Sequence, residues 1–331
     1  MPDRSLSKTD PLEDFERRNV TLQGKTKLVY VAGSGPAVVV MTEMPGISPH
    51  VARFARWVRD AGFTVYMPHL FGKDGAVPTV FTAITTIARA CIGREFRAFS
   101  ANASSPVTQW LRALAAQAHS ECGGKGVGAI GMCFTGNFAL SMMLERAVLA
   151  PVMAQPSLPL NNPAGMAIDP VELAQVKARM EAEDLTVLAY RFEGDSFCKA
   201  ERFSAFAEAL GDRFEQRVLP DEAANPRTPM KNPHSVVTLH LIDEAGQPTM
   251  QARDEILAFF KMRLTGKGPS ARPARRAPVL MLPAAHRFAP AAGRARPDWC
   301  SPRAQPARPA CSRRAAATNH RVSKPARRQS R

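Results

Sequence analysis

The feature that most constrains the fold is the alternation of short apolar runs with longer amphipathic segments between residues 18 and 265. The runs are typical of buried strands, and the segments between them have the apolar spacing of helices. Such alternation predicts a mostly parallel sheet covered on both faces, in one doubly wound α/β domain. The predicted strands include PAVVVMTE (36–43), TVYMP (64–68), GVGAIGM (126–132), LTVLAYRF (185–192) and RFEQRVLP (213–220), and the predicted helices include 49–62, 105–121, 134–146, 170–183, 199–210 and 249–264.

The net charge of +15 belongs to the C-terminal part of the chain. From Gly266 onward there are 16 Lys and Arg against one acid, of totals of 44 and 29, so residues 1–265 are neutral. Residues 266–331 are rich in Ala, Pro and Arg and lack apolar periodicity, which predicts a disordered tail. The tail is either a basic arm for nucleic acid or an out-of-frame extension of GC-rich coding sequence. Residues 1–17 are predicted to form a loose N-terminal arm.

The cysteines indicate neither a metal site nor a disulfide framework. They have no CxxC pairs and no His partners at metal spacing. The polar N-terminus lacks the apolar core of a secretion signal, and no stretch offers about 18 uninterrupted apolar residues. We therefore expect a cytoplasmic protein without a membrane span, as a monomer or a weak dimer. The six cysteines are Cys91, Cys122, Cys133, Cys198, Cys300 and Cys311.

The stretch GAIGMCFTGNF (128–138) sets Cys133 at a predicted strand-to-helix junction. Such a turn presents one side chain at the carboxyl edge of the sheet, and small residues on either side prevent a backbone collision. Gly131 and Gly136 meet that need, and Thr135 is larger but tolerable. The start of the next helix favours a thiolate. A lone Cys that ends an apolar strand is more often a small buried hydrophobe, but the flanking glycines favour a nucleophile.

A cysteine nucleophile needs a base and a carboxylate that orients the base. In this architecture both follow later strands, in the order nucleophile, acid, His. Asp195 follows the strand over 185–192 and is the expected acid, although a structural role in a Gly-Asp-Ser turn fits it equally well; Glu193 is the fallback acid. His234 lies after the last predicted strand and is the expected base. His240 is the rival base and fits better as a packed core imidazole.

Four features together resemble the dienelactone hydrolase family, whose members are α/β-hydrolases with a cysteine nucleophile. The features are TEMPG (42–46), GMCFTG (131–136), Gly194-Asp195 and a late His, and the resemblance spans about residues 25–264. It implies the α/β-hydrolase fold and a carboxymethylenebutenolidase-like enzyme that cleaves a lactone or small carboxylic ester through a thioester. Neither a metal nor an organic cofactor is required for that chemistry.

The resemblance also implies roles for individual residues. Glu43 would hydrogen-bond the resting thiol and help to activate it when substrate arrives. The backbone N–H groups of Phe134 and Met44 would hold the oxyanion. The implied triad consists of Cys133, His234 and Asp195.

Two departures from the family pattern leave the substrate open. Thr135 replaces the first of two paired glycines, and the insert DEAANPRTPMKNP (221–233) precedes the late His. Dienelactone carries a carboxylate that needs a cation. Arg94 and Arg97, in CIGREFRAF, are candidates for it, although a solvated helix face explains them equally well.

Three classes of function are therefore compared. The first is a thiol-dependent hydrolase of lactones or small esters. The second is a non-catalytic member of the same fold that binds a small molecule. The third is a nucleic-acid-associated protein that acts through the basic tail, and it ranks last because residues 1–265 are neutral. A thiol oxidoreductase is disfavoured, since Cys133 has no resolving cysteine near it in the sequence, although Cys122 or Cys198 could approach it in space.

Overall fold

The computed structural model describes residues 5–79, 82, 85–86 and 104–266. Arg94, Arg97 and residues 267–331 of the predicted tail lie outside the described residues. No helix in the described part is long and apolar enough to cross a membrane.

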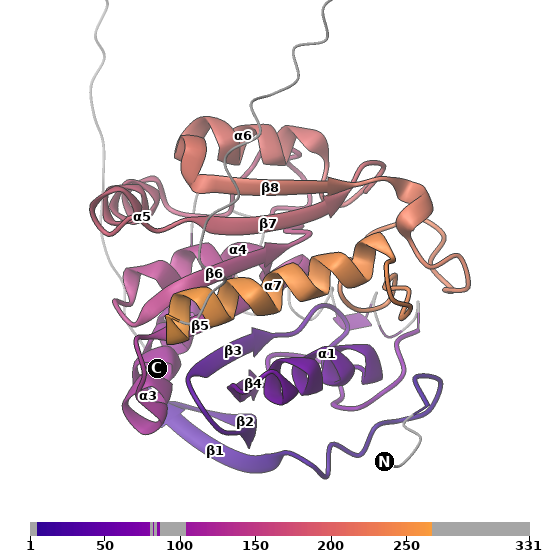
Figure 1. The fold of residues 1–331 in the computed structure, drawn as a ribbon, viewed down its shortest axis with the longest axis horizontal. Coiled ribbons are helices and arrows are strands. Elements are labelled where there is room, and N and C mark those ends of the chain that lie inside the picture. The colour runs from indigo at the N-terminus through magenta and orange to yellow at the C-terminus, as the bar shows by residue number, and fades with distance from the viewer. Residues whose placement is uncertain (1–4, 80–81, 83–84, 87–103, 267–331) are drawn as a thin grey trace, which may run out of the picture. The chain divides into compact units, whose positions relative to one another are not determined.

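The described chain forms an eight-stranded sheet with helices on both faces (Figure 1). All of the strands and helices proposed above from apolar periodicity are present, with ends shifted by a few residues. The strands are β1 (Glu16–Leu22), β2 (Lys25–Gly33), β3 (Ala37–Met41), β4 (Thr64–Pro68), β5 (Val127–Met132), β6 (Val148–Ala154), β7 (Val187–Phe192) and β8 (Phe214–Leu219). The helices are α1 (Pro49–Asp60), α3 (Val107–Cys122), α4 (Gly136–Ser141), α5 (Pro170–Ala182), α6 (Ala200–Leu210) and α7 (Pro248–Thr265).

The sheet is parallel from β4 to β8 and antiparallel at its β1 end. The spatial order is β1-β2-β4-β3-β5-β6-β7-β8, and β2 runs antiparallel to both of its neighbours. The chain passes from β3 to β4 on one side and then returns to place β5 on the other side of β3. Ligands of open α/β sheets bind at the carboxyl edge where the strand order reverses in this way. This topology directs attention to the loops that follow β3 and β5.

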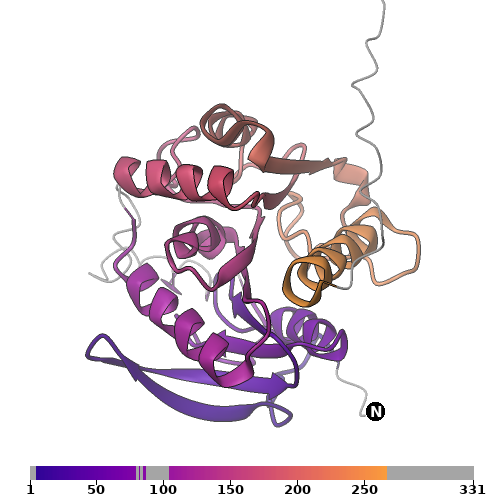
Figure 2. The same cartoon turned by 60° about the vertical axis from the view of Figure 1, so that its left-hand side comes forward.

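Each face of the sheet buries its own hydrophobic cluster. On one face, α1 contributes Val51 and Phe54, and α7 contributes Ile256 and Phe260. The opposite face is covered by α3, α4, α5 and α6 (Figure 2), whose buried side chains form the second cluster. Two covered faces explain why the central strands β3, β4 and β5 are buried along their whole length, whereas the edge strands β1 and β8 are partly exposed. This is the mostly parallel, doubly wound α/β architecture that the sequence predicts.

Residues 10–15 are packed against the domain, unlike the loose arm predicted for residues 1–17. Leu12 and Phe15 are only 2% and 4% exposed. The Arg56 guanidinium of α1 bonds the carboxylates of Asp10 and Asp14, at 2.6 to 2.9 Å. The prediction failed because this segment is mostly polar, and its anchoring cation lies some forty residues away in the sequence.

Candidate active site

Cys133 lies on a sharp turn between β5 and α4, at the carboxyl edge of the sheet. Its φ of 53° is in the left-handed region, which a non-glycine residue adopts only at a cost in strain. A Cβ at Gly131 would lie 2.1 Å from the Thr135 carbonyl oxygen, and one at Gly136 would lie 2.5 Å from the Pro156 Cα. Both glycines are therefore required by close backbone approach, as the elbow prediction expected.

Thr135 ties this elbow to the end of β3. Its side chain is fully buried. The Oγ1 accepts a hydrogen bond from the Met132 N–H at 3.0 Å and lies 3.1 Å from the Thr42 carbonyl oxygen, to which the hydroxyl can donate. Glycine could make neither contact. The residue that departs from the family pattern thus replaces conformational freedom with a hydrogen-bonded link.

His234 and Asp195 meet beside Cys133. The His234 Nδ1 and the Asp195 Oδ2 are 2.7 Å apart, and the two residues are 4% and 3% exposed. The second carboxylate oxygen of Asp195 accepts the N–H groups of Phe197 and Cys198 at 2.9 and 3.0 Å. Because both oxygens of Asp195 are engaged, the imidazole is held in one orientation. The structure thus brings the three predicted triad residues together.

The surroundings of His234 favour its protonated form. Burial alone lowers the imidazole pKa, but the charges of Cys133 and Asp195 and the hydrogen bonds to both side chains raise the pKa well above 6.5. The Ser157 hydroxyl also lies 3.5 Å from the His234 Nε2. An imidazolium beside the Cys133 sulfur is the partner that a thiolate needs.

The two rival residues occupy different places. Glu193 is exposed to solvent and is not the carboxylate that meets the imidazole. His240 is buried, and its Nδ1 accepts the backbone N–H groups of His234 and Ser235 at 3.3 and 3.1 Å. Its Nε2 donates to the Met230 carbonyl at 3.0 Å. His240 therefore shapes the loop that carries His234, as a packed imidazole.

Glu43 is buried in the same region, two residues after β3. Its Oε1 accepts the Thr238 hydroxyl at 2.6 Å, and its Oε2 accepts the Gln155 amide at 3.3 Å. Burial raises the Glu43 pKa, and hydrogen bonds together with the His234 charge offset only part of that rise. Burial is therefore the larger influence on this carboxyl, and the hydrogen-bond donors act against it.

The resemblance implied that Glu43 holds the resting thiol, and the structure gives a different arrangement. The hydrogen bonds described for Glu43 go to side chains after β6 and in the His234 loop. The Cys133 side chain interacts with His234 instead. In this structure the Cys133 sulfur therefore already faces the His234 imidazole.

Sequence reasoning missed Gln155, which follows β6 at the same sheet edge. Its side chain is fully buried and its φ is 37°, a strained value for a non-glycine residue. The amide joins the Glu43 carboxyl to the Val236 N–H at 3.3 Å. The signal was available, because Gln155 ends the apolar run VLAPVMAQ as Glu43 ends its own run.

The expected oxyanion donors come from the segments that follow β5 and β3. Phe134 follows Cys133 at the start of a short 3-10 helix, Cys133–Thr135. Met44 follows Glu43 in a turn that the Gly46 N–H closes onto the Glu43 carbonyl at 2.9 Å. Among the described residues no group of three or more His, Cys, Asp or Glu side chains is arranged to hold a metal ion.

Solved structures similar to this chain include several α/β-hydrolases. One is a candidate dienelactone hydrolase from Klebsiella pneumoniae, with 14% identity, 74% of this chain and 98% of the other covered, and a TM-score of 0.48. An esterase from Thermogutta terrifontis has 13% identity, coverage of 76% and 93%, and a TM-score of 0.44. An α/β serine hydrolase from Xanthomonas campestris has 14% identity, coverage of 78% and 98%, and a TM-score of 0.45. At such identities these similarities say nothing about the activity of this chain.

A comparison with functionally curated proteins found no match. The model of the dienelactone hydrolase family matches residues 26–218, which is more than half of the chain. The match includes Glu43, Cys133 and Asp195 and ends before His234. The chain belongs to the dienelactone hydrolase family and is a hydrolase of the α/β-hydrolase fold.

Proposed function

We propose that this hydrolase cleaves a lactone or a small carboxylic ester with Cys133 as the nucleophile, His234 as the proton carrier and Asp195 as the residue that orients His234. The observation that carries the proposal is the hydrogen-bonded series from Asp195 through His234 to Cys133 on a strained turn. The preferred substrate would be an unsaturated lactone, as for a carboxymethylenebutenolidase-like enzyme.

In the first half-reaction the Cys133 thiolate attacks the carbonyl carbon and forms a carbon–sulfur bond. The negative charge moves to the carbonyl oxygen, where the N–H groups of Phe134 and Met44 receive it. Collapse of this intermediate breaks the carbon–oxygen bond, and the departing alkoxide takes a proton from the His234 imidazolium. For a lactone, the alcohol stays attached to the acyl group. A preorganised oxyanion donor typically contributes about 3 kcal/mol to the lowering of such a barrier.

In the second half-reaction one water molecule hydrolyses the thioester. Neutral His234 removes a proton from water as its oxygen attacks the acyl carbon. The carbon–sulfur bond then breaks, which releases the acid and regenerates the thiolate–imidazolium pair; the alcohol of an ester has already left in the first half-reaction, and that of a lactone leaves as part of the acid. Asp195 keeps the imidazole oriented and stabilises the imidazolium each time it forms.

Glu43 would act in this cycle as a positioning residue. Its carboxyl links the end of β3, which precedes Met44, to the His234 loop through Thr238. The expected result of Glu43→Ala is a lower kcat with little change in KM.

The test measures hydrolysis of a dienelactone, a simple lactone and a chromogenic acetate ester by the full chain and by Cys133→Ala. Loss of a triad nucleophile lowers kcat by roughly a thousand-fold or more. Cys122→Ala is the matched control, because Cys122 is a partly exposed thiol that ends α3 and contacts Tyr66. Mass spectrometry of quenched reactions should find the acyl group on the peptide that contains Cys133.

Two results would contradict the proposal. Equal rates for the full chain and Cys133→Ala would exclude Cys133 as the nucleophile. An absence of turnover on every substrate, together with measurable ligand binding, would favour the non-catalytic member of the same fold.

A further inference from the structure

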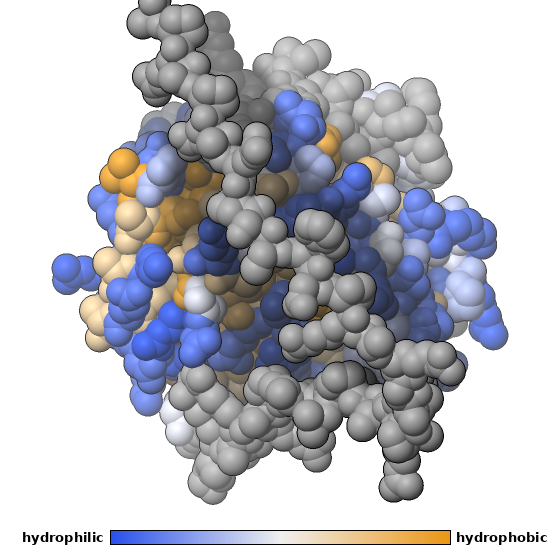
Figure 3. All heavy atoms as spheres, turned by 90° about the horizontal axis from the view of Figure 1, so that it is seen from above, coloured by the Kyte–Doolittle hydropathy of each residue, from blue (hydrophilic) through white to orange (hydrophobic). Residues whose placement is uncertain are grey.

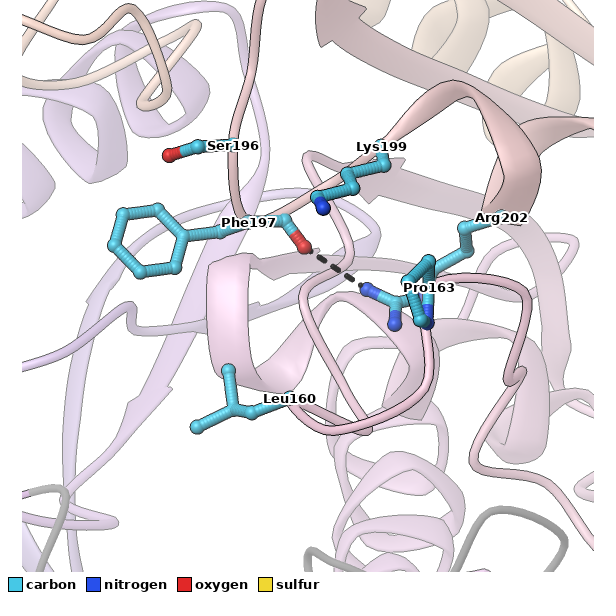
Figure 4. A pocket seen from close by; sticks show the side chains of 6 residues that line it. All are labelled: Leu160, Pro163, Ser196, Phe197, Lys199 and Arg202. Atoms are coloured by element: carbon cyan, nitrogen blue, oxygen red, sulfur yellow. Dashed lines mark hydrogen bonds between the residues drawn. The ribbon is translucent and has the colours of Figure 1, made fainter.

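A pocket of about 300 Å³ lies beside the proposed triad, and the mechanism proposed above does not use it. The pocket is lined by residues from the loop after β6, from the segment between β7 and α6 and from the first turn of α6, namely Leu160, Pro163, Ser196, Phe197, Lys199 and Arg202. Figure 4 shows these side chains. The volume is at the lower end of the range for small-molecule sites.

Two contacts connect this pocket to the triad. The Phe197 ring packs edge-on against the His234 ring, with centroids 5.2 Å apart. The Arg202 guanidinium bonds the Pro156 carbonyl at 3.0 Å, and the next residue, Ser157, donates its N–H to the Cys133 carbonyl at 2.9 Å. The pocket therefore shares Phe197 with the surroundings of His234, and its Arg202 holds the segment that bonds the Cys133 backbone.

One side of the pocket is apolar and open to solvent. Leu160 and Phe197 are 40% and 47% exposed, and they are two of only five large hydrophobic side chains exposed in the described chain. In Figure 4 both side chains extend away from Arg202, toward the same side of the pocket. Figure 3, which looks down on the molecule from above, shows a mainly hydrophilic surface interrupted by an apolar area. Exposed apolar side chains that line a pocket beside a catalytic group are a place for the hydrocarbon part of a substrate.

The other side of the pocket carries buried positive charge. Arg202 is 1% exposed, and its guanidinium donates only to backbone carbonyls, at 2.7 to 3.1 Å. No carboxylate bonds it within the described residues, and the acid that interacts with it at longer range, Asp195, bonds His234. The carbonyl partners belong to Gly165, Pro156, Phe197, Pro159 and Asn162. A buried cation without an ionic partner favours an anion nearby, because the surrounding medium screens it poorly.

Lys199 supplies a cation that a ligand can reach. It is exposed and forms no ion pair with any residue in the described ranges. It also lies at the start of α6, whose backbone N–H groups favour negative charge. In Figure 4 its side chain extends toward the middle of the group of lining residues.

We propose that this pocket binds the distal end of the substrate, and that this end is an apolar chain which terminates in an anionic group held by Lys199. The proposal rests on the hydrolase function above and narrows its substrate class to esters with a separated anion, as a carboxylate or a phosphate. Leu160 and Phe197 would cover the chain between the scissile carbonyl at Cys133 and the anion. Lys199 is then a specificity-determining residue.

The test compares nitrophenyl esters of equal chain length whose far end is a methyl group, a carboxylate or a phosphate. The full chain should hydrolyse the better anionic ester with a kcat/KM about ten-fold above the neutral one, as expected for a hydrogen bond to a charged group. Lys199→Met should bring this ratio close to one, through a roughly ten-fold loss of kcat/KM for the anionic ester. Lys261→Met is the matched control, since Lys261 is an exposed lysine of α7. The ratio should also fall as salt is added.

A binding experiment separates this proposal from the hydrolase function. In Cys133→Ala, calorimetry measures binding of adipate, a dicarboxylate product analogue, with and without Lys199→Met; about ten-fold weaker binding is expected in the double variant. Hydrolysis of neutral and anionic esters at equal rates, unchanged in Lys199→Met, would overturn the pocket assignment and leave the hydrolase function intact. Adipate binding that depends on Lys199, without turnover of any ester, would support the pocket assignment and contradict the hydrolase function. The carboxylate and phosphate esters distinguish the two anions.

Discussion

The two segments that carry the proposed triad, the elbow and the His234 loop, are held in place by contacts of very different range. At the elbow, the decisive contact joins Gly131 to Thr135, only four residues apart. The His234 loop, residues 220–247, depends on distant partners. Its hydrogen bonds reach Asp195, Gln155 and Glu43, which are 39, 81 and 195 residues from their partners in the chain. The turn at Cys133 is therefore set mainly by local sterics, with the Thr135 hydroxyl as its link to the end of β3, whereas the His234 loop is held by tertiary contacts throughout.

This comparison predicts different consequences of mutation. Damage at the elbow should remove the nucleophile's geometry at once, since no distant contact can restore it. Damage to the His234 loop should be graded, because several independent hydrogen bonds share the task.

The largest effect is expected for Gly131→Ala. The added Cβ would overlap the Thr135 carbonyl, and we expect a loss of more than about 3 kcal/mol of unfolding free energy, because neither strand nor turn can move freely. Ester hydrolysis should fall below detection. Urea unfolding and kcat/KM measure the two effects.

Gly24→Ala is the control for that variant. Gly24 has a φ of 70° in the β1–β2 turn, and a Cβ there would meet nothing within 4 Å. The expected cost is only about 1–2 kcal/mol of strain, with activity unchanged. Full activity in Gly131→Ala would show that the elbow tolerates backbone displacement.

An intermediate effect is expected for His240→Phe. The change leaves the N–H groups of His234 and Ser235 without their acceptor, at a cost of about 2–4 kcal/mol for two buried donors. Because His234 would lose its position but keep its chemistry, kcat should fall about ten-fold with little change in KM. His240→Gln, which retains an acceptor oxygen, should recover part of both losses. Loss of stability with an unchanged kcat would mean that Asp195 alone positions His234.

The smallest effect near neutral pH should be an acid sensitivity of the His234 loop. Burial, followed by the charges of Arg53 and His240, lowers the pKa of His50 to about 4, and His50 contacts the Thr238 backbone. In the unfolded chain, His50 binds a proton near pH 6.5. The contribution of neutral His50 to the unfolding free energy is therefore fully present above pH 6.5 and is lost as the pH falls toward 4. The full loss is roughly 3 kcal/mol.

Unfolding free energies of the full chain and His50→Gln at pH 7 and pH 5 measure this effect. The decline between the two pH values should be smaller in His50→Gln. His119→Gln, on α3, should retain the decline of the full chain. An identical decline in all three proteins would place the acid sensitivity elsewhere.

The difference between contacts that are near and contacts that are remote in the sequence also explains which features of the site could be predicted. Cys133, Asp195 and Glu43 each end an apolar run, so that knowledge of a parallel sheet is enough to bring them to one edge. His234 was chosen over His240 by loop position, and the structure gives each the expected surroundings. The packing of Leu12 and Phe15 was missed because the cation that holds this segment, Arg56, is remote. Arg94 and Arg97, the predicted carboxylate partners, lie outside the described residues.

Sequence by itself determined the doubly wound sheet and the elbow, since both follow from apolar periodicity and from glycines at short spacing. The tertiary structure decided which side chains meet. It placed Gln155 between Glu43 and the His234 loop, turned Thr135 into a link to β3, and gathered Lys199 and Arg202 around a pocket beside the triad. The physical reason is that periodicity reports which face of an element is buried, whereas a contact between two loops depends on where the whole sheet delivers them.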